Sequence, residues 1–257
     1  MTSRRGFLLR GLAGVIAGGA GVGLIGPRAS DSQAQSLAGP DLYMQSGMDP
    51  CQVMTPLVQK TITPDYALAL LKQGHQRFLA EAPAHCHTHT LVHGTEKGQA
   101  PFACVLSCID SRVPVETLLD QQIGDIFVAR IAGNFVNTDI LGSFEYATEV
   151  AGAKAILVLG HSSCGAIKGA LDDVKMGNIT ALLDNLKPAV RAAPPMGEVN
   201  SHNHALVDKV THINVEQTIV NMTARSPVLK ARVASGQLKV AGAIHDVHTG
   251  RITFLGS

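Results

Sequence analysis

The sequence predicts an α/β fold: a single domain in which helices flank a central, mostly parallel β-sheet that ends in an antiparallel edge hairpin at the C-terminus. Two short apolar runs, 102–106 and 155–160, are typical of buried strands. A helical segment at 138–152 lies between them, and a strand–helix–strand order predicts parallel pairing. Near the carboxyl end, a turn joins apolar runs at 238–244 and 252–255, which predicts the hairpin.

The composition allows a sizeable core and excludes some classes of partner. Hydrophobic residues make up 46% of the 257 residues and charged residues 16%, while the formal net charge is only +1. This net charge gives no sign of the strongly basic character of many nucleic-acid-binding proteins, so we expect no nucleic-acid partner. The five cysteines are too few for a disulfide framework. Cys51 and Cys86 could pair or remain free thiols.

Residues 1–35 are predicted to be an export signal rather than part of the fold. Two adjacent arginines followed by an apolar patch resemble a twin-arginine signal. We therefore expect a transient contact with export machinery, removal of the signal and a periplasmic location. An uncleaved membrane anchor at 6–26 is the alternative. Residues 36–62 are predicted to form a linker or N-terminal arm, and 63–257 the folded domain.

Capping residues and periodicity predict further elements. A hydroxyl residue, a proline and an acid at 63–65 indicate the start of a helix with apolar spacing up to residue 79. The helical pattern at 206–220 is expected to be interrupted at Gln217, and 188–204 to be a loop. The segment 83–98 is predicted to be a solvated loop that binds metal weakly at most. Its histidines are His85, His87, His89 and His93.

Reactive side chains follow the two apolar strands. Cys108, Asp110 and Arg112 come after the first strand, and His161 and Cys164 come directly after the second. Ligands bind at the carboxyl ends of strands in open α/β sheets. Two thiolates and one imidazole would supply the three protein ligands of a catalytic zinc ion and leave one position open. The helix expected after Cys164 would favour its thiolate form.

The spacing of Asp110 and Arg112 predicts a carboxylate–guanidinium pair beside this site. Both share the parity of Cys108, so an extended chain would place the three on one side. A carboxylate held ionised by a guanidinium accepts hydrogen bonds, and so would select a ligand that carries a proton. Three simpler interpretations remain open. The thiols could be small core residues, the pair could be a surface ion pair, or the site could be a structural zinc with Asp110 or Cys104 as its fourth ligand.

Four segments, in their order and spacing, resemble the β-class carbonic anhydrases. They are Cys-Ile-Asp-Ser-Arg-Val-Pro (108–114), Gly-Asp-Ile-Phe-Val-Ala-Arg-Ile-Ala-Gly-Asn (124–134), Ser-Phe-Glu-Tyr-Ala (143–147) and Gly-His-Ser-Ser-Cys-Gly-Ala (160–166). The resemblance covers the chain from about residue 63 to the carboxyl end. It implies reversible hydration of CO₂ to bicarbonate and a proton, through zinc-bound hydroxide, in a homodimer or a dimer of dimers.

The resemblance also implies a role for each matching residue. One Zn²⁺ per chain would be held by Cys108, His161 and Cys164, with Asp110 and Arg112 as the catalytic dyad. The residues that would bind substrate are Gln99, Phe127, Tyr146 and Gly165. The sequence departs from the family at Ile131, where many members have Asn, at His245, where Tyr is usual, and in having no Trp. Because the state in which the aspartate ligates zinc uses a Trp, we expect an open fourth position here.

Two other functions fit the same residues. One is hydrolysis of carbonyl sulfide or carbon disulfide, which the same fold and ligands could support. The other is a non-catalytic module that binds zinc or bicarbonate; the complete dyad and Gln99 argue against it.

Overall fold

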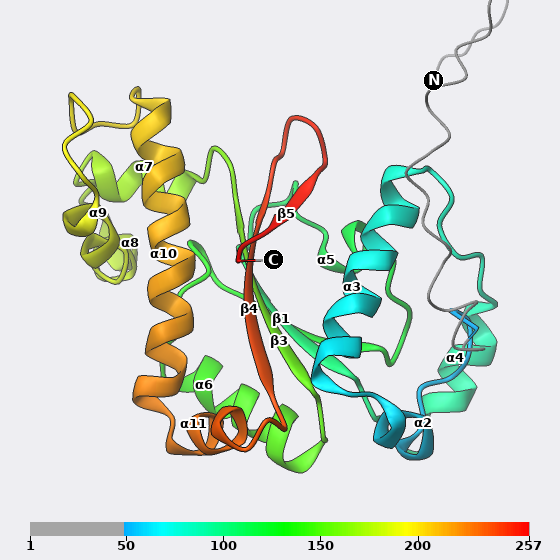
Figure 1. The fold of residues 1–257 in the computed structure, drawn as a ribbon. Helices are drawn as coiled ribbons and strands as arrows, with labels where there is room; N and C mark the ends of the chain where they lie inside the picture. The colour runs from blue at the N-terminus through cyan, green and yellow to red at the C-terminus, as the bar shows by residue number, and fades with distance from the viewer. Residues whose placement is uncertain (1–48, 257) are drawn as a thin grey trace, which may run out of the picture. The chain divides into compact units, whose positions relative to one another are not determined.

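The computed structural model describes residues 49–256 (Figure 1). The predicted export signal and residues 36–48 of the predicted linker lie outside the described residues. Of the helices in the described range, none combines the length and the apolar character needed to span a bilayer.

Within the described residues, five strands form one mixed sheet in the order β2-β1-β3-β4-β5. The first four are parallel, and the last is antiparallel to β4. The predicted fold class and the C-terminal hairpin are therefore confirmed. The strands are β1 (Ala103–Ser107), β2 (Ile126–Arg130), β3 (Ala155–His161), β4 (Lys239–His245) and β5 (Ile252–Phe254).

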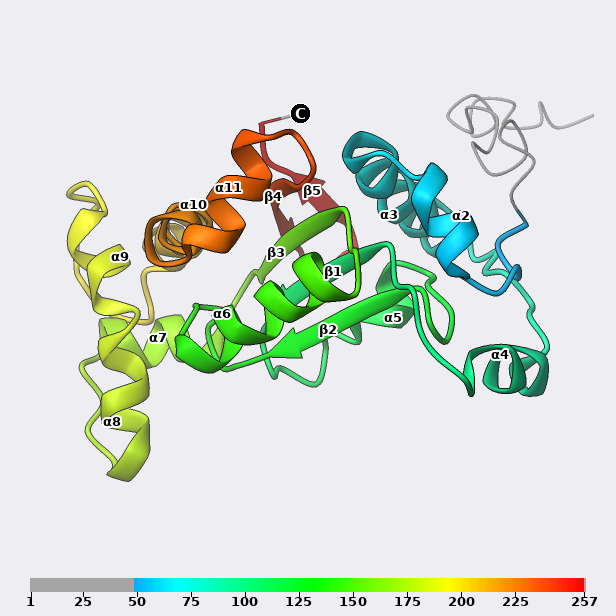
Figure 2. The ribbon, with the colours of Figure 1, turned by 90° about the horizontal axis from the view of Figure 1, so that it is seen from below.

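Helices cover both faces of the sheet (Figure 2). Alternate residues of β1 and β3 pack against α3 on one face and against α6, α10 and α11 on the other, which explains why both strands are buried throughout. The helices are α2 (Pro56–Thr61), α3 (Pro64–Leu79), α4 (Thr88–Thr95), α5 (Val115–Leu118), α6 (Thr138–Glu145), the π-helical turn η1 (Tyr146–Val150), α7 (Gly165–Leu171), α8 (Gly177–Asp184), α9 (Lys187–Ala192), α10 (His204–Arg225) and α11 (Pro227–Ala234).

The α3 helix begins where its capping residues predict. The Thr63 side chain accepts a hydrogen bond from the Tyr66 N–H at 3.2 Å, and Pro64 occupies the first turn. The predicted interruption of α10 at Gln217 is wrong. Here the polar residues on the buried side of the helix bond to a neighbouring loop, as when Asn214 donates to the Gly133 carbonyl at 2.8 Å, so they support the helix.

Three segments predicted to be irregular contain helices. In 83–98, residues 88–95 form α4, because Leu91 anchors one side of this helix in the core. Residues 187–192 form α9. The described part of 36–62 contains α2, whose buried Gln59 donates to the carbonyls of Pro101 and Ala151 at 2.7 Å each. These helices depend on contacts with distant residues, which local periodicity does not reveal.

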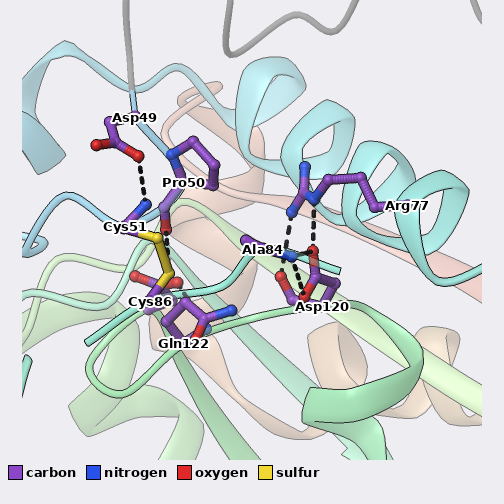
Figure 3. Close-up of a disulfide and its surroundings, with 9 residues drawn as sticks. Asp49, Pro50, Cys51, Arg77, Ala84, Cys86, Asp120 and Gln122 are labelled. Atoms are coloured by element: carbon purple, nitrogen blue, oxygen red, sulfur yellow. Dashed lines mark hydrogen bonds and ion pairs between the residues drawn. A yellow bond between two sulfur atoms is a disulfide. The ribbon is translucent and has the colours of Figure 1, made fainter. Parts of the chain in front are cut away.

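A disulfide joins Cys51, before α2, to Cys86, before α4 (Figure 3). The two Cα atoms are 5.2 Å apart, and the bond closes 35 residues of sequence that include α2 and α3. Nearby, the Asp120 carboxylate pairs with Arg77 at 2.5 Å and accepts a hydrogen bond from the Ala84 N–H at 3.1 Å. The segment between α3 and α4 is thus fixed at two points.

Candidate metal centre

The ends of two neighbouring strands bring three candidate ligands together. Cys108 follows β1, His161 is the last residue of β3, and Cys164 directly precedes α7. Because β1 and β3 are parallel and in register from Ala103–Ala155 to Ser107–Leu159, their carboxyl ends are adjacent. One ligand atom from each of the three residues lies within 4.8 Å of the other two. Each of the three residues is at most 4% exposed.

The His161 ring leaves one nitrogen available. Its Nδ1 donates to the Ser162 carbonyl at 2.9 Å, which fixes the ring and makes Nε2 the unprotonated nitrogen of the neutral imidazole. Nε2 is buried and has no hydrogen-bond partner among the described residues. Buried polar atoms are nearly always satisfied, so an orphaned imidazole nitrogen between two thiols indicates a place for a metal ion.

The two thiols interact directly. A hydrogen bond from Cys164 lowers the pKa of Cys108 to about 4, and the Gly133 N–H also contacts the Cys108 Sγ at 3.4 Å. The same contact with Cys108, together with burial, raises the pKa of Cys164. The contact therefore favours a thiolate at one of the two sulfurs, stabilised by the thiol of the other. A divalent cation would replace the remaining proton and deprotonate both.

The backbone around the ligands is shaped by two left-handed residues. Ser163 has φ +54°, which turns the chain between His161 and Cys164 so that both side chains face the same point. Gly133 has φ +81°, and a Cβ there would lie 2.7 Å from Leu186, so only glycine brings its N–H to the Cys108 sulfur at this position.

Asp110 and Arg112 form the expected pair at the edge of this cluster. The Arg112 Nε and Nη2 donate to the two Asp110 oxygens at 2.9 and 2.8 Å, and the Arg112 backbone N–H adds a third bond at 2.9 Å. These bonds hold the pKa of Asp110 well below its usual range. One Asp110 oxygen is 3.9 Å from the free His161 Nε2, so the carboxylate borders the space that a fourth metal ligand would occupy.

Arg130 also supports the site, a role that the sequence patterns above do not predict. Its Nε donates to the Cys108 carbonyl at 2.8 Å and its Nη2 to the Asp110 carbonyl at 2.6 Å. Arg130 is the last residue of β2, the other neighbour of β1. Its place at the carboxyl end of a strand in the 124–134 motif is the signal that could have identified it.

The donor set fits a catalytic zinc ion. Zinc bonds of about 2.3 Å to sulfur and 2.0–2.1 Å to nitrogen in a tetrahedron require ligand atoms about 3.4–3.8 Å apart. The three ligand atoms lie within 4.8 Å of one another, so their separation is compatible with such an ion. Cys104 is not part of the cluster. It is fully buried in the core that faces α6 and α10, and burial raises its pKa. Three ligands with a carboxylate beside them match an open site better than a closed structural one.

The four residues expected to bind substrate are not all brought to this cluster within one chain. Gly165 follows Cys164 and is exposed. Gln99 is also exposed, but it precedes the amino end of β1, and the five-residue strand separates it from Cys108 by about 16 Å.

Phe127 and Tyr146 lie together but apart from the metal ligands. Their rings make an edge contact with centroids 6.4 Å apart. Phe127 is level with Cys104 on the neighbouring strand, about 13 Å from Cys108. Both line an open groove of about 790 Å³ along β2 and α6, and Tyr146 is 51% exposed. The buried Cys-His-Cys cluster and this groove therefore lie at separate places on one chain.

Comparison with known proteins identifies the family. The family model described as "Carbonic anhydrase" matches residues 103–252, which include every residue of the cluster and the dyad. Carbonic anhydrase 2 of Mycobacterium tuberculosis is 36% identical over 191 residues, covering 73% of this chain and 91% of that protein. The carbonic anhydrase of Pseudomonas aeruginosa is 33% identical over 165 residues, covering 61% of this chain and 74% of the relative.

Solved structures agree. The β-carbonic anhydrase of Coccomyxa, in complex with acetazolamide, superposes with a TM-score of 0.59 at 30% identity, over 65% of this chain and 77% of that one. One of two tetrameric β-carbonic anhydrases from Sordaria macrospora gives 0.54 at 33% identity, over 63% and 84%. Together with the Cys-His-Cys cluster at the carboxyl ends of parallel strands, these matches show that the chain belongs to the β-carbonic anhydrase family of enzymes.

Proposed function

We propose that this protein catalyses the reversible hydration of carbon dioxide to bicarbonate and a proton, with one zinc ion per chain held by Cys108, His161 and Cys164. The observation that carries the proposal is the orphaned His161 Nε2 between two contacting thiols, next to a carboxylate that Arg112 holds ionised. A zinc ion at these ligands would make a water molecule ionise near neutral pH and so supply the nucleophile, an effect for which carbonic anhydrase with three histidine ligands is the standard example.

The residues of this chain would orient that nucleophile. Both Asp110 oxygens accept hydrogen bonds from Arg112, so the carboxylate is fixed in position and charge. Its oxygen nearest His161 can accept a hydrogen bond only from a group that carries a proton. Asp110 would therefore favour hydroxide or water over a ligand without a proton, and would aim the oxygen lone pair at the carbon of the substrate. With both its oxygens engaged by Arg112, the carboxylate is expected to leave the fourth position open.

Replacing Asp110 tests this role. Asp110→Asn keeps the size of the side chain but its amide can donate as well as accept, so we expect full zinc content and a fall in the CO₂ hydration rate on the order of 10²-fold. Asp208→Asn on the exposed side of α10 is the matched control. Stopped-flow assays with CO₂ and with carbonyl sulfide on the zinc-loaded protein would give the substrate. Wild-type rates in Asp110→Asn would reject the proposed role of Asp110. Turnover of carbonyl sulfide without hydration of CO₂ would reject CO₂ as the substrate.

We also propose that the substrate pocket is completed by a second copy of the chain, in a homodimer or a dimer of dimers. Gln99 and Phe127 lie about 13–16 Å from Cys108 in their own chain, and Tyr146, which contacts Phe127, is exposed. The groove that Phe127 and Tyr146 line lies along β2, an edge strand whose outer side has no partner strand in the described chain. A symmetric contact through this edge would offer these side chains to the partner's metal centre.

Complementation between variants tests shared sites. Asp110→Asn and Gln99→Ala are each expected to be weakly active. If Gln99 serves the partner's site, mixed dimers of the two variants contain one site with neither change. Random mixing makes half of the dimers mixed, so about a quarter of the wild-type activity should return after the chains are allowed to exchange. No recovery despite exchange, measured with differently tagged chains, would mean that Gln99 acts within its own chain or not at all.

Export to the periplasm is the third part of the proposal. The paired arginines Arg4 and Arg5 suggest the route, and the Cys51–Cys86 disulfide supports an oxidising destination. Replacing both arginines with lysine should retain the protein in the cytoplasmic fraction. Unchanged appearance in the periplasmic fraction would reject a twin-arginine signal, and recovery only in membranes, with the signal uncleaved, would favour the anchor.

A further inference from the structure

The helix α4 presents two imidazole side chains to solvent, and a carboxylate follows them on the same side of the helix. Its buried side is set by Leu91, which is 3% exposed. Gly94 is exposed, but a Cβ there would lie 2.5 Å from Val53. At 100° per residue, His89, His93 and Glu96 fall within an arc of about 60° on the opposite side of the helix from Leu91. His89 is exposed, and the side chains of His93 and Glu96 are 74% and 54% exposed.

The spacing of these residues suits a single ion. Residues four apart on a helix have Cβ atoms about 5–6 Å apart, so the imidazoles of His89 and His93 can converge on one metal ion. Helical zinc sites use the same histidine spacing. Glu96 continues the helical backbone with φ −60° and ψ −31°, and its Oε2 lies 3.8 Å from the His93 Nδ1. A carboxylate oxygen is therefore next to the second imidazole without the two being tightly bonded.

The helix is held in place independently of the catalytic cluster. The disulfide at Cys86 fixes the chain one residue before the N-cap His87, and its partner Cys51 lies two residues before the Val53 that packs on Gly94. Thr95 Oγ1 donates to the Leu91 carbonyl at 2.8 Å, which closes the last turn. Figures 1 and 2 both place α4 on the opposite side of the sheet from α7, where the Cys-His-Cys cluster lies.

We propose that His89 and His93, with Glu96 as third ligand, form a second, solvent-exposed site for a divalent transition-metal ion. Two imidazoles and one carboxylate favour zinc or copper over magnesium or calcium, and the order of metal affinities favours Cu²⁺. The site differs from the catalytic centre in having no thiolate and in being open to solvent. Among the described residues, the gathered ligand atoms are those of the Cys-His-Cys cluster, so the exposed side chains of His89, His93 and Glu96 would have to turn toward one ion. The fold itself need not change, because α4 already presents the three residues on one side.

Metal titration of the zinc-loaded wild-type protein tests the site. With Zn²⁺ in competition with a chromophoric chelator, we expect one equivalent per chain to bind beyond the catalytic ion. His89→Ala with His93→Ala should remove this equivalent. His85→Ala with His87→Ala is the matched control, because it deletes two imidazoles from the same segment but none from the helical pair, and it should keep the equivalent. Helical content by circular dichroism checks that α4 persists in each variant.

Electron paramagnetic resonance of added Cu²⁺ gives a readout that is independent of stoichiometry. The wild-type spectrum should show coupling to two imidazole nitrogens, and Glu96→Gln should keep both nitrogens while weakening the affinity. Three outcomes would overturn the proposal: no uptake beyond the catalytic ion, uptake that survives loss of both His89 and His93, or uptake that is lost with His85 and His87 instead. The last outcome would indicate a histidine-rich segment that binds metal without using the helix.

Discussion

Removal of the Cys51–Cys86 disulfide should destabilise the folded protein by an amount that its loop length sets. The bond closes 35 residues of sequence, and the chain-entropy relation for a loop of this size gives about 3.8 kcal/mol at 25 °C. For a domain of this size, that corresponds to a fall in melting temperature of about 8–15 °C. The stabilisation arises mostly from restricting the unfolded chain, so the folded structure around α2 and α3 should change little.

The experiment compares the oxidised wild-type protein with Cys51→Ala/Cys86→Ala by urea unfolding. Both samples carry zinc and have the same concentration, because metal binding and association also change apparent stability. Thiol counting in denaturant should give three free cysteines per wild-type chain, namely Cys104, Cys108 and Cys164. A stability difference below about 1 kcal/mol would refute the loop-closure argument. Five free thiols in the oxidised wild-type protein would refute the disulfide itself.

Three further predictions concern charge and metal. Burial raises the pKa of Asp125 to about 7, so the folded protein keeps a proton that the unfolded chain releases near pH 4. The free energy of unfolding should therefore fall as the pH rises from about 4 to 7. Urea unfolding across that pH range should show a flatter decline for Asp125→Asn than for the wild-type protein. Arg112→Lys cannot make the paired contact with Asp110, so hydration should slow on the order of ten-fold at unchanged zinc content; an undiminished rate would show that the fork geometry is unimportant. Chelation of the zinc ion should lower the melting temperature and make Cys108 and Cys164 react with a thiol reagent, and adding zinc back should reverse both effects. Equal thiol reactivity with and without zinc would mean that these sulfurs do not bind the ion.

The metal ligands could be predicted from the sequence because their placement follows from local rules. Two apolar runs of strand length, with a helix between them, imply parallel neighbours, and parallel neighbours place their carboxyl ends together. Cys108 and His161 come directly at those ends. The alternation beyond β1 also persists: Ile109 is 61% exposed, whereas Cys108 on one side of it is buried and Asp110 is partly buried. Periodicity therefore relates Asp110 to the thiol, but not Arg112. The predicted extended chain is wrong beyond Asp110, because residues 111–112 form a turn that the Val113 N–H closes on the Asp110 carbonyl at 3.0 Å, and this turn brings Arg112 to Asp110.

Features that depend on distant contacts could not be predicted in this way. The strand predicted at 102–106 already places Gln99 and Cys108 at opposite ends of a strand, but the sequence does not show what Gln99 contacts there. Helix α4 contains three threonines, two histidines and a glycine, so its helix propensity is weak, and burial of Leu91 in the core supports it. Arg130 acts through backbone carbonyls of the segment that follows β1, and no residue near it in the sequence indicates those partners.

The cysteines of this chain also constrain the order in which it can mature. Cys51 and Cys86 are oxidised to each other, while Cys108 and Cys164 are reduced and in contact. An oxidant that forms the first pair would find, in a metal-free chain, a second pair of sulfurs close enough to react in the same way, in a contact that favours a thiolate at one of them. A metal ion bound to both sulfurs removes them from that reaction. Metal loading before oxidation therefore preserves the centre, and the ion serves as the protecting group of the ligands that hold it.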